Sequence, residues 1–325
     1  MKVSVILPVY NGAAFLDKCL QNICGQSLSD IEVIVVNDGS KDASPDIAKK
    51  WQFRDSRVRL INQKNAGSGA ARNKGLDVAT GEFVAFMDAD DWYPEETVLE
   101  VLYRTAREFG CDIAGGSFQH VFADGRIVDT FKGIYRSYTF EATEKLPYSD
   151  YQFDYGYHRF LFRKELLDHH RIRFPDYLRY QDPPFFVRAM IAADNFCTVP
   201  DRVYSYRKGH QNVTWNGDAV QGLLYGLTDN LLMSRAQGLS RLHMLTLSRL
   251  CREYREPVLA QAKNDFQIYF CHRRFWAALD VSLISSKHHE AEQKELLHLD
   301  FAYGAFAASD GVPRAFKALL KTLDL

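Results

Sequence analysis

The chain of 325 residues is long enough for one large domain with an appendage or for two domains, and its 46% hydrophobic and 25% charged residues are an ordinary globular composition. A net charge of −1 gives no overall electrostatic attraction to nucleic acid, so no nucleic-acid partner is expected. Six cysteines without a CxxC pair disfavour a zinc site and a disulfide framework, and no run of about eighteen apolar residues suggests a membrane span. We therefore expect a cytoplasmic protein with reduced cysteines.

The first third of the chain alternates between apolar strands and amphipathic helices. Strands are predicted at 3–10, 31–38, 57–62 and 82–88, and helices at 14–26, 44–53 and 69–79. Because strands this apolar are covered on both faces, the pattern predicts a mostly parallel α/β sheet with helices on each side. Gly, Asn, Asp and Ser gather at the carboxyl ends of these strands, which is the edge where such sheets bind ligands.

The rest of the chain is less regular. The sequence predicts a helix at 94–110, two strands at 111–122 and 125–135 joined by an Asp-Gly turn, a helix at 181–194 and a strand at 202–209. The segment 131–162 is rich in Tyr and Phe, and its structure is not predicted. Beyond about Asn216 only amphipathic helices are expected, which indicates a helical C-terminal domain.

The sequence "DADDW" follows the fourth predicted strand. If the extended geometry persists, Asp88 and Asp90 face the same way and can share a ligand, and they repel each other without one. Mg²⁺ or Mn²⁺ suits such carboxylates and completes its shell with phosphate oxygens. Asp91 is expected to face elsewhere or to cap the helix that begins near Pro94, with the capping role preferred. The alternative is that all three acids only cap that helix.

Two further motifs lie at the same predicted edge. The loop "NAGSGAARNKG" contains GxG, but Arg72 stands where a dinucleotide fingerprint needs Gly or Ala. A turn that leads into a helix N-terminus can hold an anion or a sugar, or the glycines can serve a tight turn alone. Asp38 follows the second strand, where it can accept hydrogen bonds from a nucleotide or cap a turn.

Two polar groups come later in the chain. Asp182 precedes Pro183, so the local sequence predicts an N-cap with its charge at the positive end of a helix dipole. Arg207, Lys208 and His210 lie close together and can close over a diphosphate, or they form a solvated basic turn.

Five motifs occur in the order and spacing of one known family. They are "SVILPVYN", "VIVVNDGSKD", "NAGSGAARNKGL", "FMDADDW" and "QDPPFF", and over residues 1–210 the chain resembles the family 2 glycosyltransferases. The resemblance implies a GT-A fold, a Rossmann-like α/β domain that binds nucleotide sugars. It implies a catalytic domain at 1–215, with a nucleotide-binding half at 1–110 and an acceptor-binding half at 111–215. The helical domain would then occupy 216–325.

The resemblance also implies roles for individual positions. The family's DxD motif matches Asp88, Ala89 and Asp90, of which the first acid contacts the ribose side and the last coordinates the metal. Asp182 falls at the catalytic base, although the family's Glu-Asp pair is Gln181-Asp182 here. The other implied donor-binding residues are Pro8, Tyr10 and Asn11 beside the uracil or ribose, Asp38 on the base, Arg72 on the nucleotide, and Arg207 and His210 on the diphosphate.

The reaction implied by this resemblance is an inverting transfer from a UDP-sugar, dependent on Mn²⁺ or Mg²⁺. The acceptor would be a hydroxyl of a glycan or a lipid-linked saccharide. Because aromatic rings pack on sugar faces, Tyr155, Tyr157 and His158, together with Gln181, are candidates for an acceptor surface, and core packing explains such aromatics equally well.

The predicted C-terminal helices carry scattered basic residues. Such faces can rest on anionic lipid at the inner face of the cell membrane, but we rather expect them to pack on the catalytic domain or on a second subunit in a homodimer. The basic residues are Arg235, Arg241, Arg249, Arg252, Arg255, Arg273 and Arg274.

Three other functions are considered. A sugar nucleotidyltransferase needs a glycine-rich loop after the first strand, which "PVYNGAAF" is not, and an oxidoreductase needs the fingerprint that fails at Arg72. A non-catalytic protein that binds nucleotide sugars remains as the alternative from another class.

Overall fold

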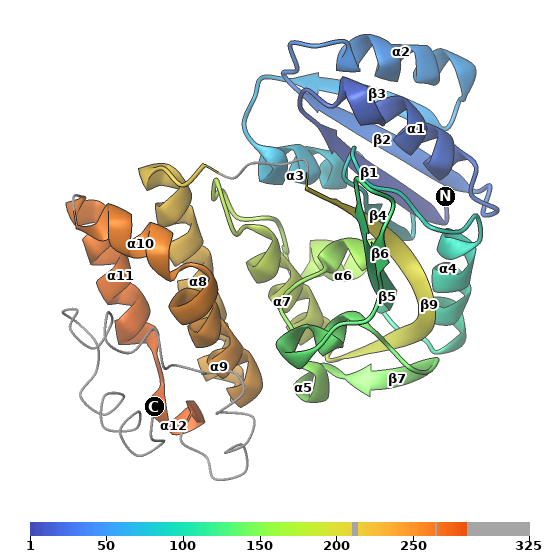
Figure 1. Cartoon of the computed structure of the whole chain (residues 1–325). Coiled ribbons are helices and arrows are strands. Elements are labelled where there is room, and N and C mark those ends of the chain that lie inside the picture. Colours follow the sequence, from blue (N-terminus) through green and yellow to red (C-terminus); the bar gives the residue numbers. More distant parts are fainter. Residues whose placement is uncertain (210–213, 264, 285–325) are drawn as a thin grey trace. The chain divides into compact units, whose positions relative to one another are not determined.

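The computed structural model describes residues 1–209, 214–263 and 265–284 (Figure 1). These residues form two compact units. The first comprises 1–151, 155–176 and 188–209, and the second comprises 152–154, 177–187 and the described chain from 214 onward. The predicted boundary at 215/216 falls near the last of these divisions. Two short earlier segments also belong to the second unit, and one of them contains Gln181 and Asp182.

The first unit is built on a nine-stranded sheet in the order β3-β2-β1-β4-β8-β5-β9-β7, with β6 paired to β5. Strands β1 (Val3–Val9), β2 (Ile31–Asp38), β3 (Val58–Gln63) and β4 (Phe83–Phe86) are mutually parallel. This part confirms the parallel sheet predicted from the apolar strands. Their carboxyl ends share one edge, as parallel pairing requires.

The other strands make the sheet mixed. The antiparallel strand β8 (Phe160–Arg163) lies between β4 and β5 (Ile113–Phe122), and β5 pairs in parallel with β9 (Asn195–Lys208). At the far edge, β7 (Glu144–Pro147) is antiparallel to β9. The Asp-Gly turn joins β5 to β6 as expected, but β6 is only Ile127–Val128, so the strand predicted over 125–135 is much shorter.

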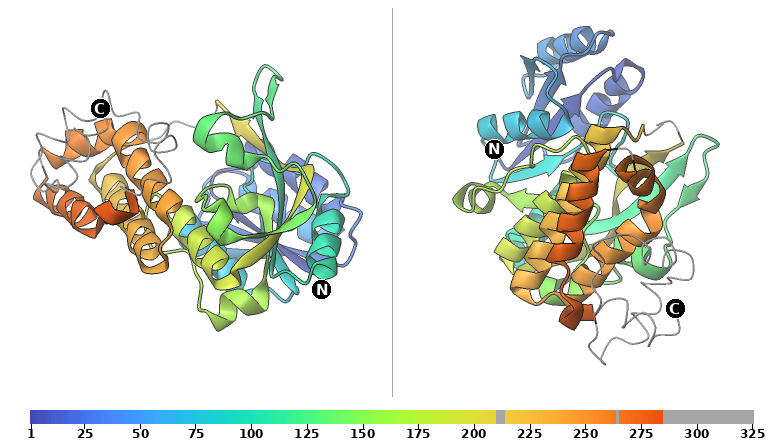
Figure 2. Two further views of the ribbon diagram at one scale, coloured as in Figure 1. Left: turned by 90° about the horizontal axis from the view of Figure 1, so that it is seen from below. Right: turned by 90° about the vertical axis from the view of Figure 1, so that its left-hand side faces the viewer.

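Helices cover both faces of the parallel strands. Helix α1 (Ala13–Cys24) and α2 (Ser44–Arg54) share one face, and Figures 1 and 2 show α3 (Ser68–Val78) on the other. Strand order turns back after β3, and right-handed crossovers then require this change of face. A Cβ on Gly75 of α3 would lie 2.4 Å from Cγ2 of Ile6, so glycine permits the close approach of α3 to β1.

Between β6 and α7 the chain also forms four short helical elements. They are the 3₁₀ turns η1 (Gly133–Tyr138) and η2 (Tyr157–Arg159) and the helices α5 (Tyr148–Tyr151) and α6 (Lys164–His169). Arg159 is 1% exposed, and its guanidinium donates to the carbonyl oxygens of Gly116 and Ser137. Most aromatic side chains of residues 131–162 are also buried, so they pack in the core.

Helix α4 (Val98–Glu108) precedes β5, and α7 (Asp182–Ala193) precedes β9. The helix predicted from Pro94 therefore begins four residues later, at Val98. The unit boundary at 187/188 falls within α7.

The second unit is helical in its described part after residue 214, as predicted. Its helices are α8 (Gly217–Gln237), α9 (Ser240–Ser248), the π-helical turn η3 (Arg249–Glu253), α10 (Arg255–Ala262), α11 (Phe266–Ala278) and α12 (Val281–Ile284). Asn216 caps α8 by accepting a hydrogen bond from the backbone N–H of Ala219, 2.9 Å away. No helix among the described residues is both long and apolar enough to cross a membrane.

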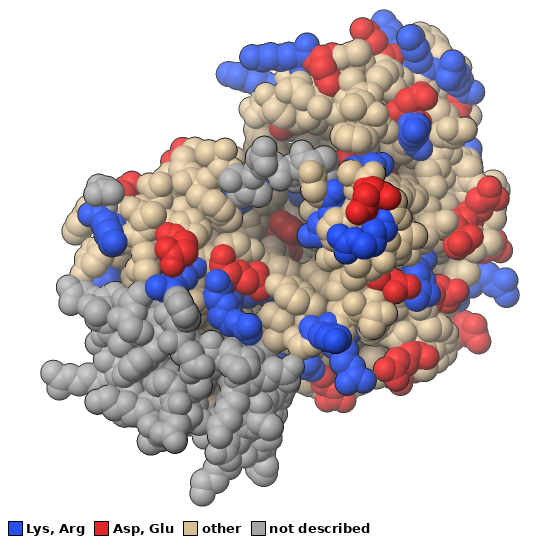
Figure 3. Space-filling view, viewed as in Figure 1, with Lys and Arg blue, Asp and Glu red and all other residues tan. Residues whose placement is uncertain are grey.

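Among the basic residues of these helices, Arg249 excludes one of the two expectations, the lipid-facing surface. It is fully buried in an ion pair with Asp154, so it cannot belong to a lipid-facing surface. On the face shown in Figure 3, basic and acidic side chains are intermingled over the described surface and form no large patch of one sign. This distribution agrees with the small net charge of the chain.

Candidate functional site

The acidic loop, which follows β4 and carries Asp88, Asp90 and Asp91, lies beside the loop after β1 and the first turns of α3. Arg72 of α3 forms an ion pair with Asp88, with 2.8 Å between Nη2 and Oδ1. A Cβ on Gly12 would lie 3.4 Å from Cβ of Ala89, which shows how closely the loop after β1 approaches the acidic loop. The structure thus brings together predicted site residues that follow β3 and β4, with the loop after β1 close to them.

Arg72 is held in one place by aromatic rings. Its side chain is 7% exposed, and its guanidinium lies 5.2 Å from the ring centroid of Tyr157 and 5.4 Å from that of Phe174. Cation–π contacts of this kind fix the orientation of a guanidinium at little entropic cost. Tyr157 is 3% exposed, so it supports Arg72 from within the core. This agrees with the core-packing alternative and not with its predicted place on an open acceptor surface.

Asp91 connects the acidic loop to β9. Its carboxylate accepts hydrogen bonds from the Tyr204 hydroxyl and from the backbone N–H of Arg207, each at 2.8 Å. Burial, followed by the charges of Asp88 and Asp90, raises the pKa of Asp91 well above its usual range. The expectation that Asp91 caps the next helix is wrong, because α4 begins only at Val98 and Asp91 is 2% exposed.

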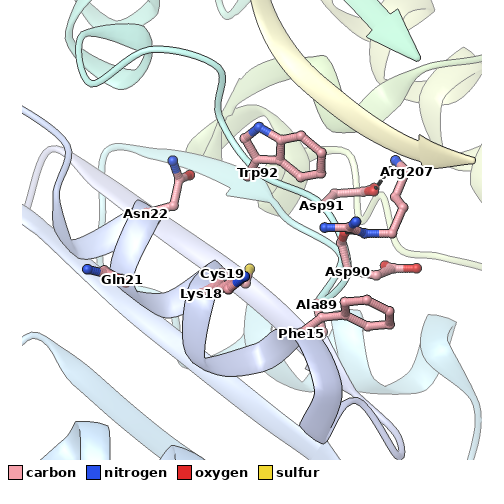
Figure 4. A pocket seen from close by; sticks show the side chains of 10 residues that line it. All are labelled: Phe15, Lys18, Cys19, Gln21, Asn22, Ala89, Asp90, Asp91, Trp92 and Arg207. Atoms are coloured by element: carbon pink, nitrogen blue, oxygen red, sulfur yellow. Dashed lines mark hydrogen bonds between the residues drawn. The ribbon is translucent and has the colours of Figure 1, made fainter. Parts of the chain in front are cut away.

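Beside this loop lies a cavity of about 350 Å³, between α1 and the residues that follow β4 (Figure 4). Arg207 enters it from β9, with its guanidinium 4.8 Å from the ring centroid of Phe15 and 4.9 Å from that of Trp92. Its Nε donates to the carbonyl oxygen of Asp90 at 2.9 Å. The cavity is lined by Phe15, Lys18, Cys19, Gln21, Asn22, Ala89, Asp90, Asp91, Trp92 and Arg207.

Cys19 lines this cavity, and His210 was predicted from the sequence to contact the diphosphate. Burial raises the pKa of the Cys19 thiol well above its usual range, which favours the protonated thiol. His210, predicted to join Arg207 at the diphosphate, lies outside the described residues.

Asp38 holds the loop between β3 and α3. Its Oδ1 accepts hydrogen bonds from Gln63 Nε2 and from the backbone N–H of Ala66, both at 2.8 Å, and its Oδ2 accepts from Gly67 N–H at 2.9 Å. The residue is 3% exposed. The carboxylate therefore shapes this loop, as in the alternative that Asp38 caps a turn. Because Oδ2 accepts only one of these hydrogen bonds, its second lone pair can accept a bond from a ligand.

The loop after β1 forms one wall of the same edge. Pro8 lies within β1 opposite Val36, and Tyr10 is 52% exposed at the end of the strand. Asn11 has a φ of 52°, its N–H donates to Ser40 Oγ at 3.0 Å, and its Oδ1 accepts from Lys41 N–H at 2.8 Å. Asn tolerates this left-handed conformation better than most residues, which explains its use at this turn.

The predicted acceptor residues differ in their surroundings. Tyr155 is half-buried in the first unit. His158 packs on Tyr204 with 4.1 Å between ring centroids, and burial lowers its pKa to about 3, so it is neutral at physiological pH. A neutral imidazole can exchange hydrogen bonds with a hydroxyl but cannot provide positive charge to a diphosphate.

Gln181 and Asp182 belong to the second unit. Asp182 is the first residue of α7, followed by Pro183 and Pro184, and is partly exposed, whereas Gln181 is 7% exposed. The helix start agrees with the sequence prediction to within one residue. Asp182 thus lies at the N-terminal, positive end of the helix dipole.

Sequence reasoning missed several residues that shape the site. Tyr204, whose hydroxyl binds Asp91, also accepts a hydrogen bond from the N–H of Asp88 at 3.2 Å. Trp92, Phe15 and Phe174 are the other missed residues, each stacked on Arg207 or Arg72. The alternation in "YSYRK" predicts that Tyr204 lies on one face of a strand, but no local signal identifies its partners.

A divalent metal is compatible with the acidic loop only if another molecule supplies part of its shell. Among the described residues, no cluster of three His, Cys, Asp or Glu side chains could hold a metal ion. Asp90 is partly exposed and Asp88 is 29% exposed in its ion pair with Arg72. Two carboxylates at an open edge suit Mg²⁺ or Mn²⁺ that binds together with phosphate oxygens, so the residues fit such an ion.

Comparisons with known proteins agree with these features. The family model Glycosyl transferase family 2 matches residues 4–171. The uncharacterized glycosyltransferase EpsJ of Bacillus subtilis is 34% identical over 219 residues, which are 65% of this chain and 62% of EpsJ, so the match spans less than two thirds of that relative. Glycosyltransferase GlyG of Streptococcus pneumoniae is 25% identical over 283 residues, 82% of this chain and 92% of GlyG.

Among solved structures, the crystal structure of Staphylococcus aureus TarS 1–349 in complex with UDP superposes with a TM-score of 0.73. The superposition covers 99% of this chain and 92% of the TarS chain, at 20% sequence identity. At this identity the likeness is one of fold.

Proposed function

The chain belongs to glycosyl transferase family 2, and on this premise we propose that it transfers a sugar from a nucleotide-sugar donor, a UDP-sugar, to a hydroxyl of an acceptor saccharide. The observation that carries the proposal is the gathering of Arg72, Asp88, Asp90 and Arg207 at one edge of the sheet. Two fixed guanidinium groups beside two carboxylates form an arrangement that suits a diphosphate with a bound cation.

The nucleoside part of the donor would lie over the ends of β1 and β2. Tyr10 is exposed there, Asn11 shapes the turn beside it, and Asp38 has lone pairs that can accept a hydrogen bond from a base. Pro8 lies at the same strand end. The UDP complex of TarS supports a uridine nucleotide for this fold.

The diphosphate would be stabilised mainly by fixed charge. Arg72 is held between Tyr157 and Phe174, and Arg207 between Phe15 and Trp92, so neither guanidinium needs to reorganise during the reaction. Asp90, with Asp88, would hold Mn²⁺ or Mg²⁺. When bound, this ion neutralises charge on the departing nucleoside diphosphate.

Asp182 would act as the general base. It would accept the proton of the acceptor hydroxyl as that oxygen attacks the anomeric carbon, and a single displacement of this kind inverts the anomeric centre. Its position at the start of α7 and its partial exposure support this role. The acceptor class that we propose is a glycan or a lipid-linked saccharide, with Tyr155 and His158 as candidate contacts.

The proposal is tested with a panel of nucleotide sugars and saccharide acceptors, with Mn²⁺ or Mg²⁺ and a chelator control, while release of the nucleoside diphosphate is measured. We expect turnover with a UDP-sugar, and loss of turnover with the chelator or with Asp90→Asn. Glu95→Gln, a change at an exposed acid in the same segment, is the matched control. If every UDP-sugar binds but none reacts, the protein is a non-catalytic nucleotide-sugar-binding protein and the proposal fails.

A further inference from the structure

The second unit contains a fully buried ion pair formed by residues far apart in the sequence. Arg249 and Asp154 are both 0% exposed, and Arg249 Nε lies 2.8 Å from Asp154 Oδ2. The Arg249 guanidinium also donates to Glu253 Oε1 at 2.9 Å. Burial of two charges costs free energy that well-packed apolar residues would not require, so the pair suggests a requirement for specific geometry.

The third member of this cluster is Tyr180. Its hydroxyl donates to Asp154 Oδ2 at 3.1 Å, and the residue is 8% exposed. Its φ is 64°, a left-handed conformation that is rare for an aromatic residue and that the surroundings must enforce. Tyr180 lies two residues before Asp182, so the buried pair is connected to the start of α7 through a strained and anchored turn.

Helix α8 supports the same turn from its backbone side. A Cβ on Gly226 would lie 2.5 Å from the carbonyl oxygen of Tyr180, and a Cβ on Gly222 would lie 3.1 Å from the backbone nitrogens of Leu178 and Arg179. The two glycines are one helical turn apart, so they form a smooth strip against which the backbone of 178–180 packs. Side chains at these positions would displace the turn.

We propose that Asp154, Arg249 and Tyr180, together with the glycine strip of α8, are positioning residues that fix the segment carrying Asp182. The inference rests on the proposed role of Asp182 as the base. It assigns a catalytic purpose to the C-terminal helices, because α8 and η3 supply the strip and Arg249. The π-helical geometry of η3 fits this assignment, since such turns occur frequently at functional sites.

The central test is Tyr180→Phe, which removes one hydroxyl and keeps the ring, the ion pair and the glycine contact. We expect kcat for transfer to fall about tenfold, because a small displacement of a catalytic group has a large effect on rate. We expect the KM for the UDP-sugar and the Kd for UDP to stay unchanged, because the proposed donor residues belong to the first unit. Tyr269→Phe, the same change on α11 of the same unit, is the control and should leave kcat unchanged.

Two further variants make the test decisive. Arg249→Lys keeps the charge but loses the contact that two guanidinium nitrogens make with the Asp154 carboxylate. We expect its kcat to be at or below that of Tyr180→Phe and its affinity for UDP to equal that of the wild type. Gly226→Ala should lower kcat by displacing the turn. A merely structural cluster would lower Tm in these variants but leave kcat per folded molecule at the wild-type value, and this result would overturn the inference.

Asp182→Asn distinguishes a failure of the positioning role from a failure of the proposed base. If this variant loses turnover while Tyr180→Phe and Arg249→Lys keep the wild-type kcat, the positioning role is wrong and the proposed base stands. If Asp182→Asn keeps its turnover, the assignment of the base is wrong, and the positioning role is overturned with it.

Discussion

One ion pair in the first unit and one in the second differ in their exposure to solvent. In the first unit, Arg72 is buried but its partner Asp88 is 29% exposed at the open edge of a sheet. In the second unit, both Arg249 and Asp154 are completely buried, and Tyr180 and Glu253 add further hydrogen bonds. A pair that remains accessible can exchange partners with a ligand, whereas a buried and satisfied pair fixes structure. The first pair is therefore suited to binding and the second to positioning.

The largest expected effect concerns the acid that the second pair is proposed to position. Asp182→Asn should lower kcat by about 10² to 10⁴, because general-base assistance typically contributes this much. Affinity for UDP, measured by calorimetry, should be unchanged. The control is Asp218→Asn, the same change in the first turn of α8, which should leave kcat unaffected. Equal losses in the two variants would contradict a specific role for Asp182.

The next largest effect concerns the buried pair and is measured as a loss of unfolding free energy. Arg249→Met leaves Asp154 buried without its cation, which should lower the free energy of unfolding by about 3 to 5 kcal/mol. Denaturant unfolding followed by circular dichroism measures the change. Arg72→Met is the matched variant in the first unit. We expect it to lose UDP affinity with a much smaller loss of stability. A larger loss of stability in Arg72→Met than in Arg249→Met would contradict the assignment of binding to the first pair and of positioning to the second.

The pH dependence of stability should come in part from a buried histidine of the second unit. His243 shares a hydrogen bond of 2.8 Å with Ser234 Oγ and accepts another from the N–H of Asp280 at 2.8 Å, and burial lowers its pKa to about 4. Its pKa in the folded state is thus below the unfolded value of about 6.5. The stability it contributes is complete above pH 6.5 and is lost as the pH falls towards 4.

We expect wild-type protein to lose about 1 to 3 kcal/mol of unfolding free energy through this group between pH 7 and pH 4. His243→Gln should be less stable at pH 7 and should show a shallower decline over that range. Unfolding curves at several pH values measure both quantities. A variant with the same slope as wild type would show that other groups cause the acid dependence.

The smallest expected effect concerns the link between the acidic loop and β9. Tyr204→Phe removes the hydroxyl that donates to Asp91 and accepts from Asp88 N–H, so stability should fall by about 1 kcal/mol. Affinity for UDP should fall a few-fold because Arg207 is joined to the same carboxylate through its backbone. Tyr206→Phe is the control on the same strand. Equal effects of the two variants would argue against a specific contribution of the Asp91 contact.

The family, the GT-A fold and the helical C-terminal region were predicted from the sequence and are confirmed. Local patterns were sufficient for these features because each early strand and helix has its own period and its own boundary residues, as in 31–38 and 69–79. The acidic loop was also recognisable, because Asp88 and Asp90 are only two residues apart. The roles of the individual site residues stay predictions.

Contacts between distant residues could not be predicted in this way. Asp91 was expected to face elsewhere or to cap a nearby helix, and its actual partners Tyr204 and Arg207 lie more than a hundred residues further along the chain. The burial of Arg249 could not be predicted because its partner Asp154 is 95 residues away. Strands β7 and β8 were missed because four-residue strands within an aromatic segment lack a clear period.

The contacts of Asp38 have a consequence for how this protein can diversify. Its carboxylate already fixes the loop that leads into α3, so a change at this position would disturb both that loop and the proposed contact with the base. Mutations that adapt the protein to another nucleotide should therefore be rare. Mutations that adapt it to another sugar or acceptor meet no such constraint at this residue, and we expect relatives to vary their saccharides more readily than their nucleotide.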